Sequence, residues 1–245
     1  AAPRHAAASP LPLPPADVTS LVRSMFAQRA YKGASPGMGI LPPEWLDLPL
    51  LHSAMRRALA DDVRDQTSLR YGEPAGDVRL RAALANRLAH LGVNADAGQI
   101  VTTAGATCAL ELVTQELLRP GDAVLVDEPG WPVEYARLTQ MGVRLLPVPR
   151  RHDGPDRDAM RAHLTNSQGP LKPRAYVTVS VLHNPTGSTL TLAAAHEVLK
   201  LAEAHELLLI EDDSYGWLAP PQAPRLAALD QLQRTVYIGG FSKIL

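Results

Sequence analysis

Short apolar segments alternate with helical segments along most of this chain, and this alternation restricts its fold more than any other feature. Six segments have the character of strands, near residues 100–103, 123–127, 143–148, 175–181, 207–211 and 235–239. Four segments between them have helical periodicity, near residues 106–118, 132–141, 156–165 and 191–205. Several strands are nearly continuous apolar runs, as parallel strands are when both faces of a sheet are covered. The pattern predicts an α/β fold, with a three-layer parallel or mixed sheet and helices on both faces.

Five of the predicted strands run directly into polar or glycine-containing clusters. In chain order these are Ala104-Gly105-Ala106-Thr107, Asp127-Glu128-Pro129-Gly130-Trp131, His183-Asn184-Pro185-Thr186-Gly187, Glu211-Asp212-Asp213-Ser214-Tyr215 and Ser242-Lys243. Ligands of open parallel sheets bind beyond the carboxyl ends of the strands, so we expect these clusters to meet at one edge. A lysine held in an apolar site at a strand end can lose its proton and attack a carbonyl group, forming a Schiff base.

Composition narrows the possible functions. Hydrophobic residues make up 46% of the chain, enough for a large core, and 24 Lys and Arg balance 25 Asp and Glu. No nucleic-acid-binding surface is evident, so we expect DNA contact, if there is any, only through a domain outside this chain. No apolar run is long enough for a membrane span, and the histidines lack metal-ligand spacing. Cys108 is the only cysteine, which suits a cytoplasmic protein without disulfides.

The chain divides into three predicted parts. Residues 1–35 begin with an Ala- and Pro-rich stretch and are predicted to form a linker or N-terminal arm, with a helix near residues 18–31. Residues 36–68 are predicted to contribute to a small domain, and residues 69–245 to form the large domain. Apolar spacing also predicts a helix from Leu48, and Asp77 and Thr191 are candidate N-caps.

The ordered set of clusters resembles the pyridoxal-phosphate (PLP) aminotransferases of class I/II, fold type I. The stretch Leu69-Arg70-Tyr71-Gly72-Glu73-Pro74-Ala75-Gly76 strengthens the resemblance, which covers about positions 36 to 245. The Glu211-Asp212-Asp213 triplet and the Ala/Pro-rich start look most like MocR-type (GntR superfamily) regulators, which join a winged-helix DNA-binding head to an aminotransferase-like body. The resemblance implies that the large domain here is C-terminally incomplete. The family's phosphate arginine, substrate-carboxylate arginine and most of the small domain are then expected after Leu245, and a winged helix before Ala1.

The resemblance also implies roles for individual residues. Lys243 would form the Schiff base with PLP and later move the substrate α-proton as a general base. Asp212 would keep the ring nitrogen protonated, although the adjacent Glu211 and Asp213 leave this assignment open by one position. Both Lys243 and Asp212 are therefore candidate catalytic residues.

Other residues would hold the cofactor without taking part in the chemistry. By resemblance, Asn184 and Tyr215 would bond the phenolic oxygen, Trp131 would stack on the ring, and Ser242 would lie beside the lysine. The N-terminus of a helix at Gly105, Ala106 and Thr107 would bind the phosphate. Tyr71 would reach the phosphate of a neighbouring subunit, which implies a homodimer. The alternatives are purely structural: Trp131 and Tyr71 could pack in the core, and Asn184 could simply form a turn.

The implied activity is amino-group transfer between an amino acid and a 2-oxo acid through a Lys243 Schiff base. Three alternatives remain open at this point. The chain could be the PLP- or amino-acid-sensing effector domain of a winged-helix regulator with little or no turnover. It could be a PLP lyase or decarboxylase on the same fold, or an inert fragment used only for assembly.

Overall fold

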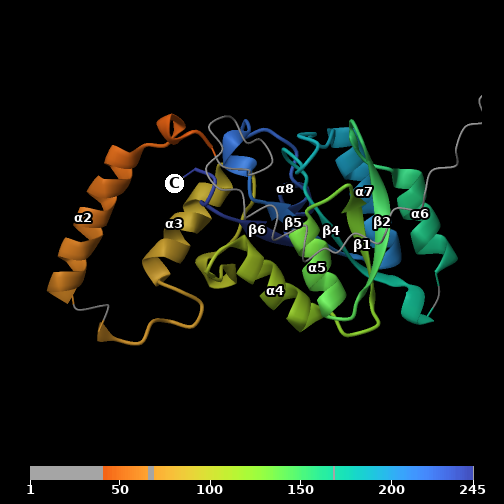
Figure 1. Ribbon diagram of the computed structural model, residues 1–245, viewed down its shortest axis with the longest axis horizontal. Helices are drawn as coiled ribbons and strands as arrows, with labels where there is room; N and C mark the ends of the chain where they lie inside the picture. The colour runs from red at the N-terminus through yellow and green to blue at the C-terminus, as the bar shows by residue number, and fades with distance from the viewer. Residues whose placement is uncertain (1–40, 66–68, 168, 245) are drawn as a thin grey trace, which may run out of the picture.

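The computed structural model describes residues 41–65, 69–167 and 169–244 (Figure 1). The predicted arm at residues 1–35 and the predicted helix near residues 18–31 lie outside the described residues. The predicted division at residue 68 is also not decided by the structure and stays a prediction.

A six-stranded sheet forms the centre of the fold, in the order β3-β2-β1-β4-β5-β6. Its strands are β1 (Ala123–Glu128), β2 (Arg144–Arg151), β3 (Gly154–Pro155), β4 (Pro173–Thr178), β5 (Leu208–Asp213) and β6 (Thr235–Gly239). All neighbouring strands run parallel except the two-residue β3, which pairs antiparallel with β2. The mostly parallel sheet predicted from the apolar runs is therefore confirmed.

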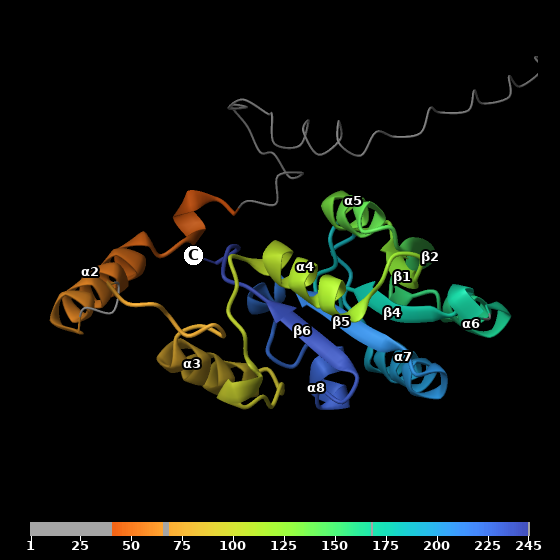
Figure 2. The ribbon, with the colours of Figure 1, turned by 90° about the horizontal axis from the view of Figure 1, so that it is seen from below.

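Helices cover both faces of this sheet, as Figure 2 shows. On one face lie α4 (Ala106–Leu117) and α5 (Pro132–Gln140); on the other lie α6 (Arg157–Asn166), α7 (Leu192–His205) and α8 (Leu226–Asp230). Alternate side chains of β1 pack against the helices on opposite faces of the sheet. Val124 and Val126 pack with α4 and α5, whereas Leu125 packs with α6 and α7. The three-layer α/β prediction is confirmed.

The strand order places a switch point between β1 and β4. The chain leaves β1 toward β2 on one side, then crosses back to add β4, β5 and β6 on the other side. Crossovers that leave in opposite directions open a crevice at the carboxyl ends of the two central strands, and such crevices are where open α/β sheets bind ligands. Asp127 and Thr178 stand at this crevice.

One predicted strand is wrong. Residues 100–103 are extended but belong to no strand of the sheet, and Val101 is 62% exposed. The backbone N–H of Thr102 donates to Ala75 O at 2.9 Å, so the segment packs along the turn at residues 75–76. A Cβ on Gly76 (φ +101°) would lie 1.8 Å from Thr102 Oγ1, which shows how close the two segments are. An apolar run becomes a β-strand only where another strand is in place to pair with it.

The two helices predicted from Leu48 and after Asp77 are confirmed. The helix expected from Leu48 is α2 (Leu48–Asp65), and Asp77 caps α3 (Val78–Ala89) by accepting from the N–H groups of Arg79 and Leu80. Thr191 likewise caps α7. Figure 1 shows α2 standing apart from the sheet, and its apolar residues Leu48, Leu50, Met55 and Leu59 are exposed. Among the described residues, no helix is both long and apolar enough to cross a membrane.

Candidate active site

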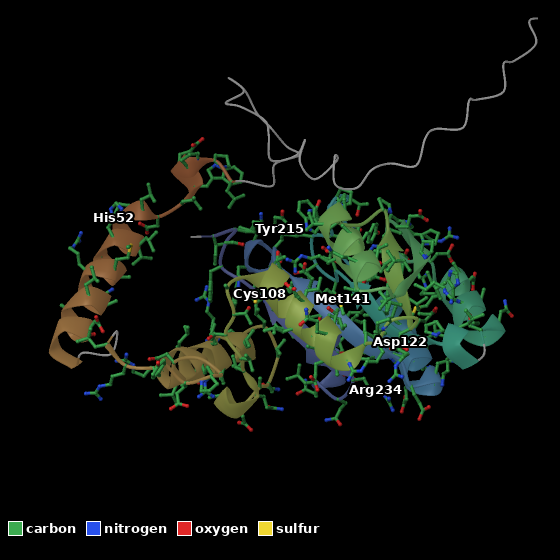
Figure 3. The ribbon with its side chains drawn as sticks, turned by 60° about the horizontal axis from the view of Figure 1, so that its bottom comes forward. His52, Cys108, Asp122, Met141, Tyr215 and Arg234 are labelled. Atoms are coloured by element: carbon green, nitrogen blue, oxygen red, sulfur yellow. The ribbon has the colours of Figure 1, made fainter. Side chains whose placement is uncertain are left out.

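A cavity of about 900 Å³ opens at the carboxyl ends of β1, β4, β5 and β6. Figure 3 shows Tyr215 at this edge of the sheet, with Asp122 and Arg234 at the opposite edge. Nine of the ten predicted site residues line the cavity: Gly105, Ala106, Thr107, Trp131, Asn184, Asp212, Tyr215, Ser242 and Lys243. The tenth, Tyr71, does not line it, and its side chain is fully exposed. The structure thus brings four separate clusters and a lysine to one place.

The N-terminus of α4 forms one wall of the cavity. Its first intrahelical bonds run to Gly105 O, from the N–H groups of Cys108 and Ala109. The N–H groups of Ala106 and Thr107 therefore precede the hydrogen-bonded turns, and such groups attract anions. Gly105 has φ +94°, and a Cβ built there would meet nothing within 4 Å. A glycine is favoured here by the backbone conformation rather than by crowding.

The three acidic side chains at the end of β5 point in two different directions. Glu211 accepts hydrogen bonds from the N–H groups of Leu226 and Ala227, both at 2.8 Å, and so caps α8. Asp213 accepts from Arg225 Nε at 2.8 Å and from the Tyr237 hydroxyl at 2.6 Å. Of the three, only Asp212 lines the cavity. Only one carboxyl group of the triplet therefore faces the cavity, since neighbouring residues of a strand face opposite sides.

Asp212 is held in place by its neighbour Ser214. Asp212 Oδ1 accepts from the Ser214 N–H at 2.9 Å and from its hydroxyl at 2.6 Å. Burial raises the pKa of Asp212, whereas the Ser214 hydrogen bonds and the charge of Lys243 act in the opposite direction. Lys243 Nζ lies 5.4 Å from the centre of the Tyr215 ring. The carboxylate, the amine and the phenol thus share one corner of the cavity.

A buried polar network supports the centre of the site, and sequence reasoning missed most of it. Asp127 accepts hydrogen bonds from the Tyr176 hydroxyl, from Thr178 Oγ1 at 2.8 Å and from the backbone N–H of Val179 at 3.1 Å. Arg150 Nη1 lies 3.3 Å from both oxygens of the same carboxylate, and the Arg150 side chain is 1% exposed. Asp127 was visible as a polar residue after a strand, but no pattern in the sequence marks Arg150, which lies within β2.

The network extends into the turn that carries Asn184. Arg150 Nη2 donates to Ser188 Oγ at 3.4 Å, and the ring of His183 bonds Thr186 Oγ1 at 2.9 Å. Burial lowers the pKa of His183 to about 4, although the Asp127 charge acts against this, so the ring is neutral at physiological pH. The turn is therefore tied to β1 and β2 as well as to its own strand.

The six-stranded sheet, with a cavity at its switch point, has the architecture of the fold type I PLP aminotransferases. LysN, the α-aminoadipate aminotransferase from Thermus thermophilus, matches this chain with a TM-score of 0.72 at 29% identity, over 84% of this chain and 52% of that one. The family model described as aminotransferase class I and II matches residues 46–245, and the chain belongs to this family.

Two curated relatives represent two kinds of protein. The (S)-3,5-dihydroxyphenylglycine transaminase of Amycolatopsis orientalis is 32% identical over 82% of this chain and 46% of its own length. An uncharacterized HTH-type transcriptional regulator of Bacillus subtilis, YdfD, is 32% identical over 71% of this chain and 36% of its own length. The chain therefore spans less than half the length of either relative and is similar to both enzymes and regulators.

Proposed function

We propose that this chain binds pyridoxal 5′-phosphate and belongs to a protein that transfers an amino group between an amino acid and a 2-oxo acid. The observation that carries the proposal is the meeting of Lys243, Asp212 and the α4 N-terminus in one cavity. The donor set suits this cofactor, since it offers N–H groups for a phosphate, a carboxylate for a pyridinium and an amine for an aldehyde. The cavity volume of about 900 Å³ lies within the roughly 300–1,000 Å³ usual for small-molecule sites.

When bound, PLP supplies an electron sink for reactions at the α-carbon of an amino acid. Lys243 is the residue proposed to attach the cofactor and to carry the α-proton at Nζ. Asp212 is proposed to hold the ring-nitrogen proton, with Asn184 and Tyr215 at the phenolic oxygen. Trp131 is proposed to cover the ring, Gly105, Ala106 and Thr107 to hold the phosphate, and Ser242 to contact the cofactor beside Lys243.

Attachment to Lys243 is tested by reduction. Borohydride treatment of the cofactor-bound whole protein, followed by peptide mapping, should place a pyridoxyl group on Lys243, which alone among the lysines in the described part of the chain lines the cavity. Lys243→Ala should show no adduct, and Lys172→Ala serves as the matched control because Lys172 instead pairs with Glu206. An adduct on Lys32, Lys172 or Lys200 in the unaltered protein would overturn the assignment.

A homodimer is part of the same proposal, with Tyr71 of one subunit reaching the phosphate site of the other. The support is that Tyr71 is fully exposed and lies outside its own cavity. We expect co-expression of Lys243→Ala and Tyr71→Ala subunits to recover about a quarter of wild-type activity, because each hybrid two-fold dimer contains one complete site. Recovery no greater than the sum of the two single variants would show that Tyr71 does not act across an interface.

A second candidate function is the effector domain of a transcription regulator, favoured by the similarity to an HTH-type regulator. A regulator of this kind would bind PLP and an amino acid, show little turnover, and reach DNA only through a domain outside this chain. Turnover assays with amino acid and 2-oxo acid pairs, run beside operator-binding assays on the whole protein, separate the two. Release of ammonia or carbon dioxide without a 2-oxo acid would instead indicate a lyase or decarboxylase.

A further inference from the structure

An aromatic stack contacts the turn that carries Lys243, and none of the roles above uses it. The ring centres of Trp217 and Phe241 lie 6.1 Å apart, and the two ring planes differ by only 11°. Offset-stacked rings at such a spacing attract each other. Phe241 begins the turn, which is closed by a hydrogen bond from the Ile244 N–H to Phe241 O at 2.9 Å. The stack therefore acts on the chain two residues before Lys243.

Trp217 is itself anchored to several parts of the fold. It lies in the short helix η6 (Gly216–Leu218) and packs against a buried cluster that includes Leu91 and Ala227. The guanidinium carbon of Arg87, on α3, lies 4.5 Å from the centre of the Trp217 ring. A cation over the face of a tryptophan is a favourable contact. The Trp217 ring is thus held by groups from outside the turn that it contacts.

The helix η6 also joins the stack to the cavity wall. Tyr215, which lines the cavity, is the N-cap residue of η6, and its ring centre lies 5.4 Å from Lys243 Nζ. A Cβ built on Gly216 would lie 2.1 Å from Asp213 Oδ2, so η6 sits directly against the end of β5. The Gly216 carbonyl also accepts a hydrogen bond from the buried Arg225 at 2.9 Å. One well-fixed helix therefore presents both the ring near the lysine amine and the ring that holds the lysine turn.

The link between β6 and the lysine turn gives a reason for such a contact. β6 ends at Gly239, and Gly240 joins it to the turn. A Cβ built on Gly240 would meet nothing within 4 Å. Glycine loses more conformational freedom on ordering than any other residue, so a glycine link is costly to hold in one conformation. A side-chain contact at Phe241 reduces the number of positions open to the residues that follow, Lys243 among them.

We propose that Trp217 is a positioning residue, which holds the Lys243 amine at the cavity edge through its stack on Phe241. Because η6 also presents Tyr215, a single element sets the places of the amine and the phenol. Arg87 extends this support to α3. The attachment of PLP to the amine rests on the proposed function, whereas the stack and its hold on the turn do not.

The first test uses the whole protein freed of cofactor. Hydrogen exchange at the Ile244 N–H reports on the turn, because this group donates to Phe241 O. Trp217→Ala should speed that exchange about tenfold, and Trp217→Phe should restore much of the protection because it keeps a ring. Exchange in β1 at residues 123–128 should not change, and Trp45→Ala, at a tryptophan that is 71% exposed, is the matched control. Unchanged exchange at Ile244 in Trp217→Ala, or equal acceleration in β1, would overturn the hold on the turn.

The second test asks whether this hold matters to the lysine. In an absorbance titration, Trp217→Ala should weaken PLP binding about tenfold, but less than about twofold in a Lys243→Ala background. The reason is that a cofactor without a bond to the lysine does not depend on where the lysine lies. Equal weakening in the two backgrounds would show that Trp217 supports the cavity as a whole, and would overturn the positioning role.

A double variant tests whether the stack is the shared cause. Trp217→Ala and Phe241→Ala together should weaken PLP binding no more than the stronger single change, because each removes the same contact. Additive weakening would overturn the stack as the route by which Trp217 acts. Failure of the unaltered protein to bind PLP would overturn the proposed function, whereas exchange at Ile244 decides the hold on the turn independently.

Discussion

Asp212→Asn is expected to bind PLP and yet slow the half-reaction with an amino acid by about a thousandfold. Asparagine preserves the shape of the side chain and can still accept from Ser214, but it has no charge to hold a proton on the ring nitrogen. Each pKa unit of lost stabilisation corresponds to about 1.4 kcal/mol and about tenfold in rate, so a deficit of about three units gives this magnitude. Single-turnover absorbance of the cofactor in the whole protein measures the effect.

Asp213→Asn is the matched control for this prediction. Asp213 pairs with Arg225, whose side chain is 0% exposed, so its replacement should lower stability while slowing the half-reaction far less. A thousandfold slowing in Asp213→Asn together with an unaffected Asp212→Asn would show that the acidic residue of the site has been assigned one position too early.

Arg150→Met is expected to lower the free energy of unfolding by about 3–5 kcal/mol, because it leaves the buried Asp127 carboxylate without its compensating charge. Asp127 would keep its bonds from Tyr176, Thr178 and Val179, but these donors carry no net charge. Such a loss is a large part of the total stability of about 5–15 kcal/mol of an ordinary protein. Urea unfolding at neutral pH measures it as a lower midpoint with an unchanged slope.

The adjacent residue supplies the control. Arg151 lies on the same strand, is 59% exposed and pairs with Asp156, so Arg151→Met should change stability by no more than about 1 kcal/mol. Equal effects at the two positions would mean that the buried network contributes no more than a surface pair. Asp127→Asn combined with Arg150→Met should lose less stability than the sum of the two single changes, because the double variant leaves neither charge buried without its partner.

Much of the fold could be predicted because it depends on local patterns. Apolar runs such as residues 123–127 and 207–211 gave strands, and periodic segments gave α4 to α7 within about two residues. The caps at Asp77 and Thr191 were predictable because a cap is a contact between near neighbours. The apolar run at residues 100–103 misled, since its partner is a turn about 25 residues away rather than a strand. The short α8 and β3 carry too few residues for a periodic signal.

The candidate site, too, could be predicted from the sequence only in part. The residue pattern was enough to predict that clusters ending several parallel strands would share one edge, because strand direction and side-chain alternation are local properties. Nine of the ten predicted site residues line one cavity for that reason. Three features became visible only in the folded chain: which carboxyl of residues 211–213 faces the cavity, the neutralisation of Asp127 by Arg150, and the burial of Glu134 in the cavity wall. These depend on burial and on charges brought together from separate strands and helices, and electrostatic interactions at short range follow distance in space rather than distance along the chain.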